Sequence, residues 1–368
     1  MSGEKSSGKY EDLSFDEILT GLAEKWREVP GGSDDTERQF SDSLLQMSDE
    51  AFLLFWEKQA QAGYELRSWW WNIYSDLLRS KKVLEVGSGM GFDAVTFALN
   101  GAHVTCCDVA PTNLQVVSRI ARLKNLDIKT LPIESIRSFD SLPDDFEIFW
   151  ACGSLINLPF KAAREECAAI LKHLKSDARW IELAYPRERW TRDNSPSFAM
   201  WGKMTDGERT PWIEWYDMER LKQRLYPHKF ERLLEYHYCS EAYIWLDARR
   251  VGMCDEQFSI TVAPPAESIE TPPNLWNFAW STPLPKQEKS NVTLEIRCTI
   301  ENGAVGFVIE KDGKFISREV TVDAGASDKL VYLATDQFGD GSFLSTRNAC
   351  GFGKSKFSIE SLTLRNRL

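Results

Sequence analysis

Three glycines at every second position, Gly87, Gly89 and Gly91, separate a short apolar run from a helix-like one in the stretch VLEVGSGMGFDAVTFALN. Glycine permits a tight strand-to-helix turn, and it lets backbone amides approach a ligand closely beside a helix N-terminus. The next predicted strand ends at Asp108, where a carboxylate can accept hydrogen bonds from both hydroxyls of a ribose. The turn and this acid together indicate a nucleoside ligand.

The spacing of the glycines separates two kinds of nucleoside-binding turn. A dinucleotide-binding turn follows the pattern G-x-G-x-x-G, but Phe92 stands where the third glycine would be needed, which disfavours an NAD-dependent dehydrogenase. The run EVGSGMG that begins at Glu85, followed by Asp93 and Asp108, resembles motif I and its partner acid in the class I S-adenosylmethionine-dependent methyltransferases. The resemblance covers roughly residues 80–265, and it is specific for the superfamily but not for the substrate.

This resemblance implies S-adenosylmethionine as the cofactor and assigns parts of its binding site. The glycines would pass under its methionine part, Glu85 would anchor the turn and face its amino group, and Asp108 would hold the ribose. Near the adenine the candidate is Glu134, for which a solvated loop carboxylate is an equal alternative. In WACGSLINLP, Ser154 and Asn157 are expected to face the donor methyl. The expected cofactor-binding residues are Glu85, Gly87, Ser88, Gly89, Gly91, Asp93, Asp108, Glu134, Ser154 and Asn157.

The implied reaction is an in-line displacement at a sulfonium methyl, for which the protein chiefly holds donor and acceptor at attack distance. A sugar hydroxyl also needs a general base, whereas an amine needs only to arrive deprotonated. The catalytic candidates are Tyr185 and Asp193, after the fifth strand at the carboxyl edge of the sheet, and His237 in a later strand. Asp193 equally suits a turn, His237 suits a partly exposed strand position, and Glu182 is an edge or a site residue, so the sequence does not choose among them.

An α/β sheet must position these residues. Five short apolar strands alternate with helices, as is typical of a parallel sheet covered on both faces: KVLEVGS, AHVTCCDV, DIKTLPI, FEIFWACGS and ARWIELAY. A helix, DMERLKQRLY, and two antiparallel strands, FERLLEYHYCS and EAYIWLDARRVG, follow. We therefore expect an α/β, Rossmann-like, seven-stranded methyltransferase sheet over residues 79–265.

The two flanking regions have different patterns. Residues 1–78 are expected to form a helical cap, because apolar residues recur at helical spacing between Ser41 and Leu78. The proline-rich stretch VAPPAESIETPPNL predicts a linker, and the short alternating strands beyond it, broken by DGK, DAGAS and FGDGS turns, predict an all-β sandwich over residues 266–368.

The carboxyl-terminal part also bears on the substrate class. Its ending, STRNACGFGKSKFSIESLTLRN, is similar to the ends of carbohydrate-binding β-sandwich modules on some bacterial glycan-modifying methyltransferases, with a structural or dimerising sandwich as the alternative. Several tryptophans between Trp190 and Trp215 follow no simple buried period, so some are expected to line a pocket. Indole faces suit sugar rings, and they equally suit an apolar or cationic acceptor.

Composition limits the partners and the location. The net charge of −11 argues against a nucleic-acid partner. The eight cysteines lack metal-ligand spacing, so we expect thiols and no metal. No apolar run approaches the roughly 20 residues that span a bilayer. The polar start of the chain lacks the apolar centre of a secretory signal, so a cytoplasmic location is expected. The oligomeric state stays open, a homo-oligomer included.

The sequence thus predicts a methyltransferase that uses S-adenosylmethionine to methylate a hydroxyl of a bacterial glycan or sugar nucleotide. One alternative is N-methylation of a small amine, with the tryptophan-rich stretch as a cation-holding box. Another is a non-catalytic glycan-binding or scaffold protein that retains the cofactor fold. The intact glycines and Asp108 argue against that last alternative.

Overall fold

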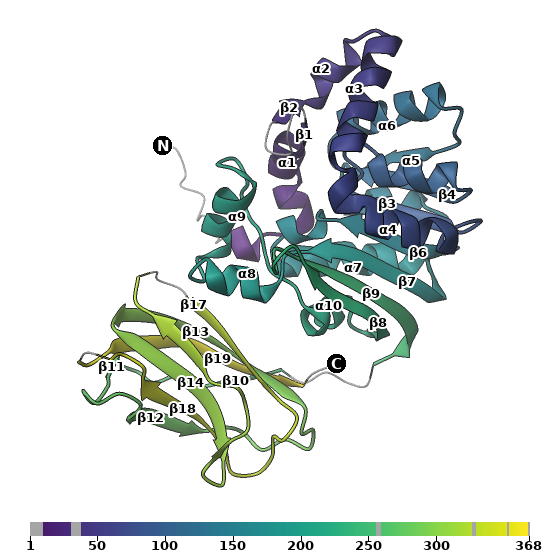
Figure 1. Ribbon diagram of the computed structural model, residues 1–368. Coiled ribbons are helices and arrows are strands. Elements are labelled where there is room, and N and C mark those ends of the chain that lie inside the picture. Colours follow the sequence, from purple (N-terminus) through teal and green to yellow (C-terminus); the bar gives the residue numbers. More distant parts are fainter. Residues whose placement is uncertain (1–9, 31–37, 255–258, 326–328, 352, 367–368) are drawn as a thin grey trace, which may run out of the picture. The chain divides into compact units, whose positions relative to one another are not determined.

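The computed structural model describes residues 10–30, 38–254, 259–325, 329–351 and 353–366. The chain forms two compact units (Figure 1), one of Met1–Arg189 with Phe198–Met253 and one of Trp190–Ser197 with Cys254–Leu368. The division after Met253 differs from the sequence-based boundary after residue 265. The reason is that strand β10 (Ser259–Val262) and strand β11 (Ile269–Glu270), on either side of that boundary, both pair with the last strand of the second unit.

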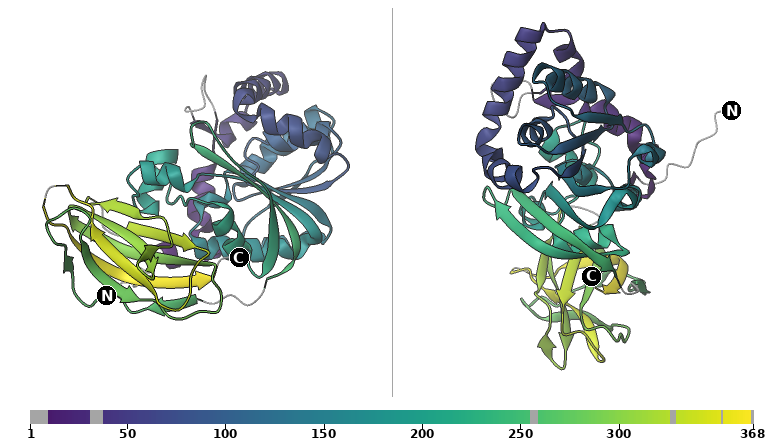
Figure 2. Two further views of the ribbon diagram at one scale, coloured as in Figure 1. Left: turned by 60° about the horizontal axis from the view of Figure 1, so that its bottom comes forward. Right: turned by 90° about the vertical axis from the view of Figure 1, so that its right-hand side faces the viewer.

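A seven-stranded sheet is the centre of the first unit, as predicted, with the strand order β5-β4-β3-β6-β7-β9-β8. The strands from β3 to β7 run parallel, and β9 and β8 add an antiparallel edge. Helices cover both sides of the sheet (Figure 2). The strands are β3 (Lys82–Val86), β4 (His103–Asp108), β5 (Lys129–Pro132), β6 (Phe146–Cys152), β7 (Leu174–Ala184), β8 (His228–Tyr238) and β9 (Tyr243–Met253).

The helices follow from apolar residues at helical spacing. In α6 (Pro111–Leu123), Pro111 occupies the first turn, where its missing N–H costs nothing, and Val116, Val117 and Ile120 are buried against the sheet. One core joins α3 to α6 with the strands β3, β4, β6 and β9. The other helices of this region are α5 (Phe92–Leu99), α7 (Phe160–Ile170), α8 (Arg187–Arg192), α9 (Phe198–Asp206) and α10 (Met218–Leu225).

The amino-terminal cap is mainly helical, as expected, but it also contains a short antiparallel pair, β1 (Glu28–Pro30) with β2 (Arg38–Phe40). Its first helix begins with a capping box between Ser14 and Glu17, in which the amide and the hydroxyl of Ser14 both donate to the Glu17 carboxylate. The helices are α1 (Phe15–Trp26), α2 (Ser41–Leu45), α3 (Asp49–Ala62) and α4 (Tyr64–Leu77).

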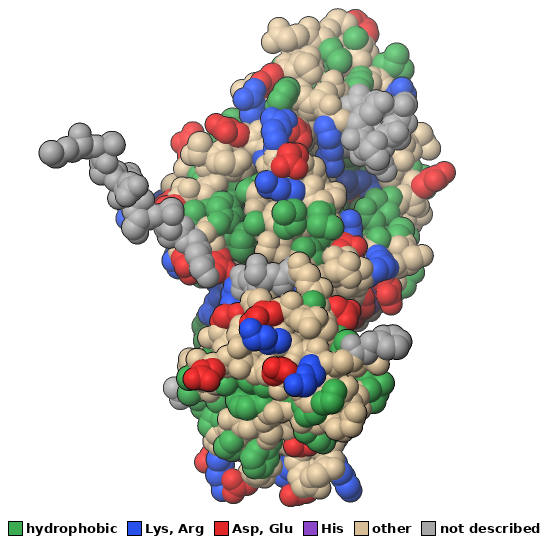
Figure 3. Space-filling model, turned by 90° about the vertical axis from the view of Figure 1, so that its left-hand side faces the viewer, with side chains coloured by type: hydrophobic (Ala, Val, Ile, Leu, Met, Phe, Trp, Pro, Cys, Tyr) green, Lys and Arg blue, Asp and Glu red, His purple; other side chains and the backbone are tan. Residues whose placement is uncertain are grey.

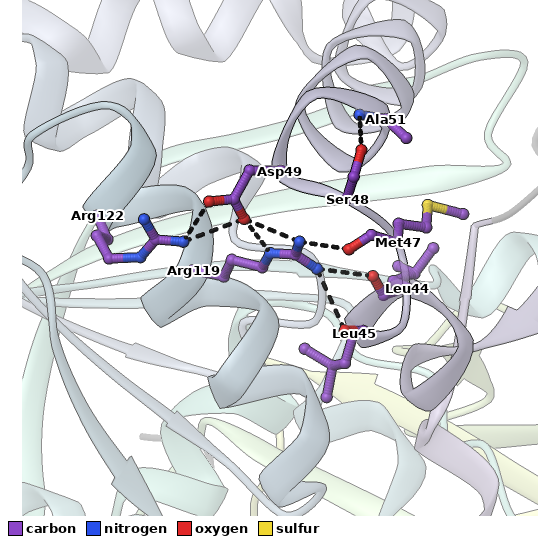
Figure 4. Close-up of polar contacts among 8 residues, drawn as sticks. All are labelled: Leu44, Leu45, Met47, Ser48, Asp49, Ala51, Arg119 and Arg122. Carbon is purple, nitrogen blue, oxygen red and sulfur yellow. Dashed lines mark hydrogen bonds and ion pairs between the residues drawn. The ribbon is translucent and has the colours of Figure 1, made fainter.

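Arg119 of α6 ties this cap to the sheet (Figure 4). Its guanidinium donates to the carbonyls of Leu44 at 3.0 Å and Met47 at 2.6 Å, where α2 ends, and to the carboxylate of Asp49 at 2.8 Å, where α3 begins. A cation at a helix C-terminus and an anion at a helix N-terminus both match the helix dipole. The cap is therefore fixed to the methyltransferase-like sheet at the point where α2 meets α3.

A buried ion pair explains Glu182, which the sequence left as an edge or a site residue. Glu182 of β7 and Arg224 of α10 are both fully buried and paired with each other, and the indole N–H of Trp180 also donates to Glu182 at 2.9 Å. Removing one partner of such a pair would leave an uncompensated buried charge. Glu182 is thus a structural residue of β7, and its carboxylate is buried against Arg224 of α10.

The second unit is all-β, as predicted, and consists of two antiparallel sheets that share one core. One sheet has the order β10-β19-β13-β17 with β11 beside β19, and the other has the order β12-β18-β14-β15 with β16 beside β14. Inward residues from both sheets alternate with outward ones, which is the pattern of a β-sandwich. The remaining strands are β12 (Phe278–Pro283), β13 (Val292–Asn302), β14 (Ala304–Lys311), β15 (Lys314–Phe315), β16 (Val320–Asp323), β17 (Lys329–Thr335), β18 (Ser342–Asn348) and β19 (Lys356–Asn366).

The surface carries charges of both signs. Figure 3 shows one face of the molecule, on which acidic and basic side chains lie beside each other and small groups of hydrophobic side chains separate them.

Within the part of the chain that the structure describes, every helix is too short or too polar to cross a membrane.

Candidate active site

A cavity of about 330 Å³ lies in the first unit, at the carboxyl ends of the parallel strands. Val86, Asp108, Cys152 and Leu183 line it from the ends of four neighbouring strands. Open α/β sheets place ligands at this edge. The cap supplies part of the wall, with Phe15, Leu22, Trp26 and Val29.

The three glycines of the first turn have different physical reasons. All have positive φ angles, which favour glycine. A Cβ on Gly87 would lie 2.2 Å from the Cβ of Ser154, and one on Gly91 would lie 2.9 Å from Val117, so these two glycines permit close packing within the protein. A Cβ on Gly89 would meet nothing within 4 Å, and Gly89 lines the cavity. Gly89 is therefore the glycine whose backbone is open to a ligand.

Asp108 fixes this turn from the end of β4. Its carboxylate accepts hydrogen bonds from the amide of Gly89 at 2.9 Å, from the amide of Ala110 at 2.8 Å and from the side chain of Asn113 at 3.3 Å. Burial raises the pKa of Asp108, and these hydrogen bonds oppose the rise because they favour the carboxylate. The acid lines the cavity at the position that the sequence assigned to it.

The loop after β6 brings two further predicted residues to the cavity. Ser154 donates its hydroxyl to the carbonyl of Val86 at 2.6 Å, which holds the loop against the end of β3. Asn157 donates its amide group to the carbonyls of Gly153 at 3.0 Å and Ser154 at 3.1 Å. Its Oδ1 atom is buried and has no hydrogen-bond partner among the described residues, so it is an acceptor available to a ligand.

Asp93, a predicted cofactor-binding residue, lines the cavity, but its carboxylate is held by four side chains of the protein. The indole N–H groups of Trp70, Trp71 and Trp150 donate to it at 3.2, 2.6 and 3.1 Å, and Arg67 donates at 3.2 Å. These donors leave little capacity for a ligand. Asp93 therefore joins α4 and β6 to the start of α5.

The remaining predicted residues of the turn also lie at the cavity. Ser88 is buried in its wall, and Glu85 extends from β3 into the same region. Burial and the nearby carboxylate of Asp93 raise the pKa of Glu85 well above its usual range, and Arg67 opposes the rise.

Of the predicted catalytic residues, Tyr185 lies at the cavity. It is paired there with Asp206, which the sequence did not suggest. The Tyr185 hydroxyl donates to Oδ1 of Asp206 at 2.8 Å, and both residues line the cavity. The guanidinium of Arg189 lies 4.0 Å from the centre of the Tyr185 ring, and the ring of Tyr243 lies 5.7 Å from it. Burial raises the pKa of Asp206, and the hydrogen bond from Tyr185 opposes the rise.

Four predicted site residues lie outside the cavity lining, and the first of them is Gly91, which packs against Val117. Glu134 is exposed after β5, although its neighbour Ile133 lines the cavity. His237 lies on the edge strand β8, where its Nδ1 atom is 3.9 Å from Oε2 of Glu188 in α8. Asp193 follows α8 in the segment that groups with the second unit. All predicted cofactor residues except Gly91 and Glu134 line the cavity, and Tyr185 is the one predicted catalytic residue that does so.

The tryptophans between Trp190 and Trp215 do not form the expected pocket. All four of them are buried, and none lines the cavity. The aromatic residues at its wall are instead Phe15 and Trp26 of the cap, Phe92 of the first turn, and Tyr185 and Tyr243 at the ends of β7 and β9. The sequence offered no signal for Trp26 or Tyr243, because each belongs to an element whose place in the sheet or cap was only known from the fold.

Comparison with known families gives the chain its class. Residues 83–177 match the family model described as a methyltransferase domain, and this match includes the glycine turn, Asp108 and Asn157. No curated protein matches the sequence. The described residues contain no group of three or more His, Cys, Asp or Glu side chains that could hold a metal ion.

Several solved structures resemble the chain. One is a putative O-methyltransferase from Nostoc punctiforme, with 15% identity over 53% of this chain and 60% of that chain and a TM-score of 0.40. Another is an O-methyltransferase family protein from Burkholderia thailandensis, with 12% identity over 57% and 67% and a TM-score of 0.41. A third is magnesium protoporphyrin IX methyltransferase from Synechocystis, with 15% identity over 52% and 84% and a TM-score of 0.39.

The matched domain and the strand order of its sheet define the class of protein. The chain is an enzyme of the methyltransferase class, and S-adenosylmethionine is its cofactor.

Proposed function

We propose that this enzyme transfers a methyl group to a hydroxyl of a sugar-containing acceptor, either a glycan or a sugar nucleotide, with Asp206 as the general base. The observation that carries the proposal is the Tyr185–Asp206 pair on the wall of the cavity that also contains the glycine turn. A hydroxyl must lose its proton during transfer, whereas an amine does not need a base, so a positioned carboxylate favours an oxygen acceptor.

The residues of the cavity fit the cofactor. Gly89 leaves open space above its backbone, Asp108 ends β4 beside it, and Asn157 offers a buried acceptor without a partner among the described residues. We assign the ribose to Asp108 and the methionine part to the backbone of the turn. The cofactor supplies a methyl group on a sulfonium, which is the group transferred. The protein residues hold the acceptor in line with it and exclude water.

Asp206 has the properties of a base. Its Oδ1 atom accepts the hydrogen bond from Tyr185, which fixes the orientation of the carboxylate, while its Oδ2 atom accepts none from the described side chains. Burial raises its pKa above the usual value for aspartate, so the carboxylate is a stronger base than an exposed one. Tyr185 is the positioning residue: its own pKa is raised well above the usual value by burial and by Asp206, so it remains a donor.

The wall around this pair supports a sugar as the acceptor. The rings of Tyr185 and Tyr243 lie together beside Asp206, and the apolar face of a sugar can pack on such rings while its hydroxyls reach the carboxylate. Lys25 donates to the Asp206 carbonyl at 2.9 Å and to Glu28 at 2.7 Å, so polar groups of the cap reach the same region. Glu28 and Arg38 also line the cavity.

The test is to incubate the full chain with S-adenosylmethionine labelled in the methyl group and with three sets of acceptors: sugar nucleotides, short oligosaccharides and small amines. We expect the label in a methyl ether of a sugar, identified by mass spectrometry. Transfer to amines alone, with equal rates in Asp206→Asn and in the unchanged protein, would contradict the proposal. Binding of S-adenosylhomocysteine, measured in parallel by calorimetry, shows that each variant retains its cofactor site.

A further inference from the structure

A cluster of exposed aromatic rings surrounds one arginine on the second unit. The guanidinium of Arg347 lies 4.7 Å from the ring centre of Phe315, 5.1 Å from that of Trp276 and 5.8 Å from that of Phe278. Phe278 of β12 lies opposite Arg347 of β18 in the sheet, and Phe315 belongs to β15 at the other side of β14. The cluster therefore covers the outer face of this sheet.

The arginine at its centre is fixed by an acid. Arg347 donates from both Nε and an outer nitrogen to the carboxylate of Glu319, the first at 3.0 Å. The two side chains lie over Gly306 of β14: a Cβ there would be 2.2 Å from Oε1 of Glu319. These two hydrogen bonds fix the orientation of the guanidinium plane, against which the rings pack.

The rings remain open to solvent although they are fixed in place. Trp276, Phe278 and Phe315 are 44%, 51% and 44% exposed. Trp276 also has a φ of 65°, in the left-handed region that a bulky residue rarely adopts, and its amide donates to the carbonyl of Asn348 at 2.6 Å. Backbone strain of this kind persists where the surrounding structure enforces it, and it is frequent at binding sites. The exposed position of the indole is thus enforced by the fold.

We propose that this cluster, formed by Trp276, Phe278, Phe315, Arg347 and Glu319, is a binding site for a neutral oligosaccharide, separate from the methyl-transfer cavity. The charges of Arg347 and Glu319 cancel, so the site offers no net attraction to an ionic ligand. The rings supply apolar faces for sugar C–H groups, and the ion pair between them supplies both donors and acceptors for hydroxyls. This combination matches the chemistry of a sugar better than that of a purely apolar ligand.

The size of the cluster argues against a second copy of the chain as its occupant. Three aromatic side chains exposed to about half of their surface offer together about 300 Å², on the scale of 150–250 Å² for a whole aromatic side chain. A stable protein interface buries about 800 Å² on each partner. The patch is thus large enough for two or three sugar rings and too small for a dimer contact by itself.

The test measures binding of cellohexaose, xylohexaose and mannohexaose to the full chain by calorimetry, without a methyl donor. We expect at least one of them to bind, and we expect Trp276→Ala and Phe315→Ala to weaken that binding at least about tenfold, while Trp276→Tyr retains most of it. The matched control is Phe343→Ala, an exposed phenylalanine of β18 without a recorded contact to Arg347.

Three results would overturn the assignment. One is the absence of binding of all three oligosaccharides up to millimolar concentrations. The second is a loss that is equal in Phe343→Ala and Trp276→Ala, or no loss in either. The third is a dimer that sedimentation velocity detects in the absence of sugar and that Trp276→Ala abolishes. Affinity for S-adenosylhomocysteine, unchanged in all variants, confirms folding and separates this site from the proposed active site.

Discussion

Two aspartates line the same cavity, Asp93 and Asp206, and they differ in the number of protein groups that donate to them. Asp93, at the start of α5, accepts hydrogen bonds from three indoles and one guanidinium. Asp206, at the end of α9, accepts one side-chain hydrogen bond, from Tyr185. A carboxylate has about four acceptor positions, so the first is saturated and the second is not. Both acids lie at the cavity, so proximity alone does not distinguish them. We base the assignment of the general base on the acceptor positions that remain free on Asp206.

The difference extends to the surroundings of each acid. The side of Asp93 is rigid: Trp70 stacks on Trp245 at 5.0 Å, and Trp150 contacts the rings of Tyr74 and Phe97. The side of Asp206 consists of the end of a short helix and the ends of two strands. The first region stabilises the turn that presents the glycines, and the second keeps a carboxylate oxygen of Asp206 without a side-chain donor among the described residues.

The strongest test of the comparison is Asp206→Asn. We expect kcat to fall about 10²- to 10⁴-fold, because that is the usual contribution of a general base. Affinity for S-adenosylhomocysteine should be unchanged. The measurement is steady-state transfer of labelled methyl to the acceptor found in the screen. An equal fall in Tyr185→Phe would mean that the tyrosine is itself essential, whereas a smaller fall supports its role as a positioning residue.

The pH profile of the same reaction gives an independent sign. Only the ionised form of Asp206 can accept a proton, and its pKa is raised by burial, so kcat should rise with pH through a value above that of an ordinary aspartate and then level. This limb should be absent from the residual activity of Asp206→Asn. A profile that is the same in both proteins would contradict the assignment of the base.

Asp93→Asn tests the other half of the comparison. The substitution removes the charge that balances Arg67 and places an NH₂ group among indole N–H donors, so we expect a loss of about 3 kcal/mol in the free energy of unfolding. Urea denaturation, followed by circular dichroism, measures it. Activity per folded molecule should fall far less than in Asp206→Asn. A stable variant with a large loss of kcat would show that Asp93 acts in the reaction.

The sequence predicted the first region better than the second, for a physical reason. The glycine turn, Asp108 and Asn157 are local to one strand–turn–helix unit and its neighbours, so their spacing along the chain carries their arrangement. Asp206 lies 21 positions after Tyr185, and the connection between them includes both α8 and α9, so no period predicts such a pairing. The same limit explains why buried tryptophans were taken for a pocket.

Strand pairing caused the other difference. The proline-rich stretch around residue 265 predicted a linker, but prolines are compatible with the short strands β10 and β11 at the edge of a sheet. Their pairing with β19, about 90 to 100 residues later, is a long-range contact that composition does not reveal. The seven-stranded sheet was predictable because its central strands β3, β4, β6 and β7 have a strong local apolar signal.

Asp108→Ala removes an acid that accepts hydrogen bonds from three groups of the protein and, in our proposal, keeps an acceptor position for the ribose. We expect affinity for S-adenosylhomocysteine to fall about 10- to 100-fold, because both a ribose acceptor and the hydrogen bond that fixes Gly89 are lost. Calorimetry measures it. Glu134→Ala is the matched control, since its exposed side chain lies outside the cavity lining and its removal should change the affinity less than about threefold. Equal losses would return Glu134 to the cofactor site.

Glu166, a further buried acid at the cavity, tests what happens when an acid has neither the donors of Asp93 nor the partner of Asp206. Burial raises its pKa from 4.5 to about 8, and Arg224 opposes the rise. The folded state therefore keeps a proton that the unfolded state loses above pH 4.5, so stability should fall as pH rises between about 4.5 and 8.

Glu166→Gln mimics the protonated acid, so it should flatten this slope by roughly 1 kcal/mol per pH unit within the window. The measurement is the free energy of unfolding in urea at several pH values. Glu134→Gln, at an exposed position, should leave the slope as it is. If Glu166→Gln has the same slope as the unchanged protein, Glu166 is ionised in the folded state and its charge is compensated by Arg224.

The smallest effects are expected for the acid and the histidine that the sequence suggested and the cavity excludes. Asp193 follows α8, and His237 lies on the edge strand β8 beside Glu188; neither side chain lines the cavity. We expect Asp193→Asn and His237→Asn to change kcat by less than about twofold, which is within the range of surface substitutions away from a site. His237→Asn should also leave the pH limb assigned to Asp206 in place. A tenfold loss in either variant, at unchanged stability, would mean that the acceptor extends beyond the cavity to that residue. The comparison of Asp93 with Asp206 would then not describe the whole acceptor site.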